Sequence, residues 1–218
     1  MPAQLTRRSW VLHCSALALG ALAGPAAQAA KRSSARILVL GDSLSAEYGL
    51  PRGSGWVALM EQRLKQEGFD ARVFNASISG ETTAGGRARL PTLLTQHRPT
   101  HVVIELGAND ALRGLPLSMT RKNLDEMATA TRATGAKLVI VGMRLPPNYG
   151  QRYGEDFMAV FASVAKDHQG ALVPFLLKNV ADVAQPEAFF QADRIHPTVQ
   201  AQPLMLDNVW PVLKPLLV

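Results

Sequence analysis

Residues 36–44 read Arg-Ile-Leu-Val-Leu-Gly-Asp-Ser-Leu, and this stretch decides how the chain is expected to fold. Its first part, Arg36–Leu40, is an almost wholly apolar run that stops at a glycine, which is typical of a strand buried in a parallel sheet. The polar pair Asp42-Ser43 follows at once. Sites in parallel α/β sheets form beyond the carboxyl ends of the strands, so Ser43 is expected at a functional edge.

Short apolar runs and helical segments alternate along the rest of the chain. Further strands are predicted at 72–76, 101–106, 137–141 and 171–174, and helices at 56–64, 87–96, 118–134, 156–168 and 198–217. Strands separated by helices imply right-handed crossovers, and therefore a parallel sheet with helices on both faces. Gly80 and Asn109 each follow a predicted strand, so both are expected at the same edge as Ser43.

The first 30 residues are expected to be an export signal rather than part of the domain. Arg7 and Arg8 form a basic start, Trp10–Ala23 is apolar, and Ala27-Gln28-Ala29 fits the cleavage rule for small residues. Residues 31–218 are then one domain in a periplasmic or secreted protein. The paired arginines leave Sec and twin-arginine export open, and an uncleaved N-terminal anchor is the alternative.

Composition excludes several classes of function. Cys14 is the only cysteine and lies in the predicted signal, so the mature chain would have no thiol nucleophile and no disulfide. The formal net charge of +6 is scattered and no basic run is interleaved with aromatic residues, which argues against nucleic-acid binding. No second stretch is long and apolar enough to span a bilayer. We expect no metal, no cofactor and a monomer.

Three residues could perform serine-based acyl transfer. Ser43 is the candidate nucleophile, and a serine hydroxyl needs a neighbouring base. His196 is the candidate base, and Asp193, three residues earlier, can orient its ring. The alternatives are a helix-capping serine and an ordinary surface turn. The chain has no Gly-x-Ser-x-Gly motif, which argues against an α/β-hydrolase nucleophile elbow.

Two further residues could hold a developing oxyanion, together with the Ser43 N–H. Gly80 offers a backbone N–H without a side chain in the way, and Asn109 offers an uncharged amide donor. The alternatives are a turn glycine and a helix cap. We interpret Asp42 as structural, with its side chain bonded to loop backbone, and expect Glu105 to support the far side of the site.

These residues stand in four ordered blocks, Gly41–Leu44, Gly80, Gly107–Asp110 and Asp193–Pro197, that resemble the SGNH (GDSL) hydrolases. Four further stretches are similar to the bacterial group of arylesterases, acyl-CoA thioesterases I, protease I and lysophospholipases: Asn75–Gly80, Ala88–Pro91, Val103–Gly107 and Arg144–Gly150. The resemblance implies a flavodoxin-like three-layer α/β/α sandwich with a five-stranded sheet. It also implies that the loops 111–117 and 143–147 line the acyl chain, with Leu145 and Pro146 as substrate contacts; simple packing is the alternative.

Three positions depart from the family pattern. Ala108 replaces the second glycine of a usual Gly-Gly-Asn-Asp block, Arg194 replaces the glycine of Asp-Gly-Ile-His-Pro, and Glu47 replaces a small residue. We expect these changes to affect substrate preference more than catalysis.

The sequence thus predicts an exported serine hydrolase that cleaves esters and thioesters of acyl groups through an acyl-Ser43 intermediate. Its partners would be acyl esters, thioesters or lysophospholipids. A carbohydrate O-deacetylase on the same fold and a non-catalytic lipid-binding module are the alternatives, and the intact set of site residues argues against the second. Activity is expected to fall in acid as the imidazole becomes protonated.

Overall fold

The computed structural model describes residues 34–218 and is built on a five-stranded sheet in which all neighbouring strands are parallel. The strands are β1 (Ala35–Gly41), β2 (Ala71–Asn75), β3 (His101–Glu105), β4 (Lys137–Val141) and β5 (Ala171–Val173). Their order is β2-β1-β3-β4-β5, so the direction of winding reverses between β1 and β3. This reversal is the point at which parallel sheets form sites. The predicted fold class is confirmed.

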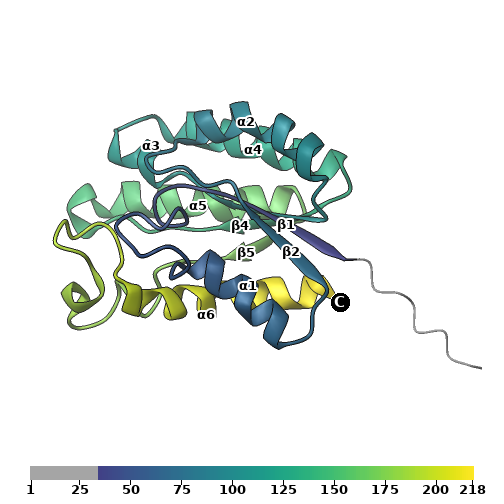
Figure 1. Ribbon diagram of the computed structural model, residues 1–218. Coiled ribbons are helices and arrows are strands. Elements are labelled where there is room, and N and C mark those ends of the chain that lie inside the picture. The colour runs from purple at the N-terminus through teal and green to yellow at the C-terminus, as the bar shows by residue number, and fades with distance from the viewer. Residues whose placement is uncertain (1–33) are drawn as a thin grey trace, which may run out of the picture. The chain divides into compact units, whose positions relative to one another are not determined.

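Helices cover both faces of the sheet (Figure 1). The α-helices are α1 (Trp56–Gln66), α2 (Thr83–His97), α3 (Ala108–Leu112), α4 (Leu117–Ala133), α5 (Gln151–Asp167) and α6 (Gln202–Leu213). Short 3₁₀ turns are η1 (Pro147–Tyr149), η2 (Pro186–Phe189), η3 (Val199–Ala201) and η4 (Lys214–Leu217). Helices α2, α4 and α5 lie on one face, and α1 and α6 pack together on the other.

The two central strands form the middle of the core. Every side chain from Ile37 to Leu40 on β1 is fully buried, as expected for a strand covered on both faces. Strand β3 pairs with β1 in a register that sets Glu105 directly beside Gly41. A buried carboxyl group therefore lies next to the point where the chain leaves the sheet toward Ser43.

Helix α2 begins four residues earlier than predicted, at Thr83. Gly85 and Gly86 indicated a loop, but they lie in the first turn of the helix. A Cβ on Gly86 would lie 2.3 Å from Leu106 Cδ1, so this glycine allows the helix to approach the end of β3. The glycine serves close packing here rather than a turn.

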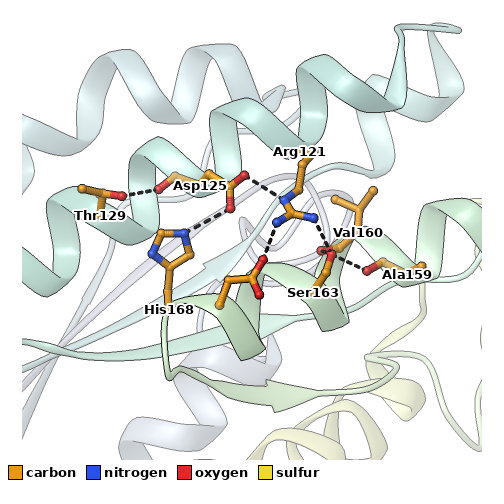
Figure 2. A network of polar contacts seen from close by, with 8 residues as sticks. Arg121, Asp125, Thr129, Ala159, Val160, Ser163 and His168 are labelled. Atoms are coloured by element: carbon orange, nitrogen blue, oxygen red, sulfur yellow. Dashed lines mark hydrogen bonds and ion pairs between the residues drawn. The ribbon is translucent and has the colours of Figure 1, made fainter.

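A polar cluster on the outer side of α4 and α5 joins these two helices (Figure 2). The Arg121 guanidinium donates to Asp125 (2.8 Å), Ser163 (2.7 Å) and Asp167 (2.6 Å). His168, the C-cap of α5, lies 3.1 Å from the other oxygen of Asp125. The cluster therefore fastens α4 to the C-terminal half of α5 and includes the His168 side chain.

Other boundaries also differ from the sequence predictions: within the predicted helix 198–217, α6 spans only Gln202–Leu213 and 3₁₀ turns flank it. The sequence predicts no helix between residues 106 and 118, but the short helix α3 begins at Ala108. Helix α5 begins at Gln151, five residues before the predicted start. The predicted export signal, residues 1–30, lies outside the described residues.

Candidate active site

Ser43 and His196 meet at the carboxyl edge of the sheet, although 153 residues separate them in the chain. Ser43 lies in the turn that follows β1, and its Oγ lies 2.9 Å from Nε2 of His196. This is hydrogen-bond distance, so the imidazole can take the hydroxyl proton. The predicted candidate nucleophile and base are therefore brought together.

Asp193 orients the imidazole from its other side. Its Oδ2 lies 2.7 Å from His196 Nδ1, while its Oδ1 accepts the backbone N–H groups of Ile195 (2.9 Å) and His196 (3.0 Å). The His196 backbone N–H, then the His196 ring and the Ile195 N–H, lower the pKa of Asp193 to about 2. The carboxylate is thus ionised and can fix the tautomer that leaves Nε2 facing Ser43.

Two residues that sequence reasoning missed hold this histidine loop in place. The Tyr48 ring lies 4.2 Å from the His196 ring between centroids. The Gln191 side-chain amide donates to the carbonyls of Tyr48 (2.9 Å) and Pro197 (3.1 Å). The contacts of Tyr48 with His196 and with Gln191 join segments far apart in the chain, so no local spacing in the sequence could have indicated them.

The loop that carries Gly80 has a defined conformation. Gly80 has φ +77°, in the left-handed region that favours glycine. Its carbonyl accepts a hydrogen bond from the Arg113 guanidinium (2.8 Å), while Arg89 forms an ion pair with Glu81 and donates to the Ala76 carbonyl (2.9 Å). Gly80 is therefore fastened on both sides; its role as an oxyanion donor, which would need such a fixed position, stays a prediction.

Asn109 lies in α3, where its side chain does not cap the helix but turns back to the nucleophile loop. Its Nδ2 donates to Asp42 Oδ2 at 2.9 Å. One amide hydrogen is used in this bond and the other remains for a ligand. The neighbouring Asp110 is fully buried and accepts from the backbone N–H of Thr83 (2.8 Å) and from its hydroxyl. This bond joins the Asn109 helix to the start of α2, just beyond Gly80.

Asp42 is structural, as predicted, but its role is larger than predicted. Its Oδ1 accepts the N–H of Leu44 at 3.0 Å, which is the expected bond to loop backbone, while Oδ2 orients Asn109. Glu105 lies behind it and accepts from the Asp42 N–H (3.3 Å) and the Ser45 hydroxyl (2.7 Å). Burial raises the pKa of Asp42 to about 6, and burial together with the Asp42 charge raises that of Glu105 well above its usual range.

The three departures from the family pattern have distinct placements. Arg194 is exposed and has φ 58°, a conformation in which the usual glycine would be unstrained. Glu47 faces its own loop, where its carboxylate accepts the N–H groups of Gly53 and Gly55. Ala108 is partly buried against the core. The Glu47 side chain therefore fastens the nucleophile loop.

The predicted acyl contacts lie in the loop between β4 and η1. Leu145 is partly buried against the core, and Pro146 is exposed immediately before η1. Both residues lie at the carboxyl edge of β4. Their contact with an acyl chain remains a prediction. Within residues 34–218 no helix is long and apolar enough to cross a membrane, and no group of three or more potential metal ligands is present.

Comparison with known proteins places the chain in a family. Residues 39–202 match the model of the GDSL-like lipase/acylhydrolase family. The chain is 55% identical over 181 residues to an esterase, TesA, of Pseudomonas aeruginosa, and the match covers 83% of this chain and 89% of that protein. It is 41% identical over 180 residues to thioesterase 1/protease 1/lysophospholipase L1 of Escherichia coli, with coverage of 83% and 84%.

Solved structures agree with this placement. The crystal structure of TesA matches with a TM-score of 0.80 and 54% identity, over 84% of this chain and 99% of that one. A psychrotrophic esterase, EstA, from Pseudoalteromonas, solved with monoethylphosphonate as inhibitor, matches with a TM-score of 0.78 and 41% identity, over 84% and 98%. The family model and the solved structures both match well over half of the chain, and the chain belongs to the GDSL-like lipase/acylhydrolase family.

Proposed function

We propose that this protein is a serine hydrolase that cleaves carboxylic esters and thioesters of acyl groups. The observation that carries the proposal is the unbroken chain of contacts from Ser43 through His196 to Asp193, at 2.9 and 2.7 Å. The close relatives described as esterases, arylesterases and thioesterases support the same reaction class.

The geometry supports a two-step acyl transfer. Ser43 Oγ attacks the carbonyl carbon while His196 Nε2 takes the hydroxyl proton. The carbonyl electrons move to the oxygen, which accepts hydrogen bonds from Asn109 and from the N–H groups of Ser43 and Gly80. His196 then gives its proton to the leaving alcohol or thiol as the tetrahedral carbon collapses to acyl-Ser43. A water molecule, deprotonated by His196, repeats the sequence and releases the acid.

Labelling with an alkyl phosphonate tests the nucleophile. The wild-type protein should gain one adduct, found on Ser43 by mass spectrometry, and lose hydrolysis of p-nitrophenyl acetate in step with labelling. Ser43→Ala should neither label nor hydrolyse. Ser118→Ala, which changes an exposed serine on α4, is the matched control and should behave as wild type. An adduct elsewhere with Ser43 unmodified would contradict the assignment.

Exposed apolar side chains around the nucleophile support acyl rather than carbohydrate substrates. Ile78, Leu112 and Ile195 are 48%, 44% and 53% exposed; Ile78 and Ile195 lie on loops that also carry a site residue, and Leu112 ends the helix that carries Asn109. Such side chains favour contact with an acyl chain. A panel of p-nitrophenyl esters from short to long chain, with lysophospholipid, acyl-CoA and acetylated xylan, tests this preference. Cleavage of the xylan ester alone would contradict it.

The protein is also proposed to act outside the cytoplasm, in the periplasm or as a secreted enzyme. The support is the sequence of the first 30 residues, with its basic start, apolar run and cleavage motif. Cell fractionation of the full chain should place the mature enzyme outside the inner membrane. Arg7→Lys with Arg8→Lys should block this only if export uses the twin-arginine route.

A further inference from the structure

Glu105 and Asp42 form a buried carboxyl pair beneath the proposed oxyanion site. Asp42 is 1% exposed and Glu105 2% exposed, and none of the ion pairs formed within residues 34–218 involves either one. Two adjacent carboxylates without a cation cannot both be ionised in such a place. The pair therefore holds a proton.

The hydrogen-bond partners decide which carboxyl holds it. Both oxygens of Asp42 accept N–H groups, one from Leu44 and one from Asn109, so Asp42 has the surroundings of an anion. Glu105 accepts through a single oxygen, Oε2, from the Asp42 N–H and the Ser45 hydroxyl, so its carboxyl lies against Asp42 while its other oxygen accepts no hydrogen bond from the described residues. A proton on Glu105 can be donated to Asp42, whereas a proton on Asp42 would displace one of its two N–H donors.

The fold keeps this contact close. Gly41 lies beside Glu105 in the register of β1 and β3, and a Cβ on Gly41 would lie 2.9 Å from Glu105 Oε2 and 2.7 Å from Ser45 Oγ. The glycine before Asp42 thus leaves room for Glu105 to reach under the nucleophile loop. Any larger residue would push the carboxyl away from Asp42.

We propose that Glu105 is a positioning residue that, as a neutral acid, hydrogen-bonds Asp42 and thereby holds the Asn109 amide in its donating orientation. The inference rests on the proposed function, because it assigns a supporting group to the Asn109 oxyanion donor. The contacts run from Ser45 to Glu105, from Glu105 to Asp42 and from Asp42 to Asn109. Deprotonation of Glu105 adds a second buried charge and disrupts the last of these contacts.

A double-mutant cycle tests whether Glu105 acts through Asn109. Glu105→Leu should lower kcat for p-nitrophenyl acetate by about 10- to 100-fold with KM unchanged, less than the loss of the donor itself. In an Asn109→Ala background the same change should lower kcat by less than about threefold, because the group it positions is gone. His101→Leu, a buried polar site at the opposite end of β3, is the control and should act additively with Asn109→Ala.

Glu105→Gln keeps the shape and a neutral donor, so it supplies the test even if Glu105→Leu does not fold. It should retain kcat within about threefold of wild type, since the amide can replace the neutral carboxyl. Each carboxyl of the pair faces the other, and His196 is the further titratable group that acts on Asp42. Wild-type kcat should therefore fall at alkaline pH as Glu105 loses its proton, and the glutamine variant should lack this fall.

Three results would overturn the proposal. These are additive effects of Glu105→Leu and Asn109→Ala, an alkaline fall unchanged in Glu105→Gln, or a glutamine variant as impaired as Asn109→Ala. If any of these three results is found while Ser43→Ala and Asn109→Ala still inactivate the enzyme, only the positioning role of Glu105 is contradicted. Full activity of Asn109→Ala would contradict both the positioning role of Glu105 and the assignment of Asn109 as an oxyanion donor.

Discussion

Asp193 and Asp42 serve the same site in opposite environments. Asp193 lies in an exposed loop, where backbone N–H groups and the His196 ring lower its pKa to about 2. Asp42 lies below the site, where burial raises its pKa to about 6 despite its N–H donors. One carboxylate orients the base and the other orients an oxyanion donor. The difference teaches that hydrogen bonds fix the direction of both carboxylates, but they lower the pKa only at Asp193, because burial outweighs them at Asp42.

The largest expected effect comes from replacing Asp193, the exposed carboxylate of this comparison. Asp193→Asn should lower kcat by roughly 10³- to 10⁴-fold, because the amide favours the wrong tautomer of His196. KM should change little, since Asp193 does not face the substrate. Steady-state hydrolysis of p-nitrophenyl acetate measures the effect. Retention of more than a tenth of wild-type kcat would show that Asp193 does not orient the base.

Changes at the buried side should have smaller effects. Asn109→Ala removes one oxyanion donor and should lower kcat by about 10²- to 10³-fold. Asp42→Asn should fall between wild type and that variant, because its amide cannot accept from both Leu44 and Asn109. The measurement is the same, with circular dichroism as the control for folding. An Asp42→Asn enzyme with wild-type kcat would show that Asn109 needs no support.

The two acids should affect stability with opposite signs of pH dependence. Asp193 has a lowered pKa, so its stabilising contribution is present above its unfolded pKa of about 3.8 and is lost as pH falls toward 2. Asp42 has a raised pKa, so the folded state loses stability as pH rises from about 3.8 to 6, by an amount on the order of 3 kcal/mol. These two carboxyl groups together therefore favour the folded state most near pH 4.

Urea unfolding across pH 3–8 measures these slopes. Asp193→Asn should remove part of the loss on the acid side, and Asp42→Asn should flatten the decline toward neutral pH. A variant that changes the slope on the wrong side of the maximum would contradict the assignment of charge to that residue.

The smallest expected effect concerns the backbone of the exposed loop. Arg194 has φ 58°, a region that disfavours residues with a Cβ by about 1–2 kcal/mol. Arg194→Gly should raise the free energy of unfolding by no more than about 1 kcal/mol, because the greater freedom of glycine in the unfolded chain offsets part of the gain. Arg194→Ala, which keeps the strain, is the control and should show no gain. Thermal unfolding measures both.

Much of the fold followed from local pattern. Apolar runs that end at polar residues predicted the strands and placed Ser43, Gly80 and Asn109 at one edge of the sheet. Helix α2 was misjudged at its start because Gly86 resembles a loop residue until its contact with Leu106 is known. Such close packing depends on residues brought together by the fold and leaves no periodic trace in the sequence.

In the candidate site, too, some contacts could be predicted from local sequence and others could not. Asp193 and His196 are three residues apart, so their bond could be predicted from spacing alone. The contacts of Tyr48 with His196, and of Asp42 with Asn109, join segments that follow different strands. The residue types alone could suggest that Asp42 was structural, but only the register of β1 and β3 places Glu105 behind it.

The bonds from Asp110 to Thr83 have one further consequence. Asn123 on α4 also donates to the Thr83 hydroxyl (2.9 Å), so three helices converge on a single side chain behind the active centre. If heating breaks these bonds, Gly80 and Asn109 should leave their positions in the site together. Activity should therefore be lost on heating without a partly active intermediate. This loss should occur at a lower temperature than unfolding of the sheet.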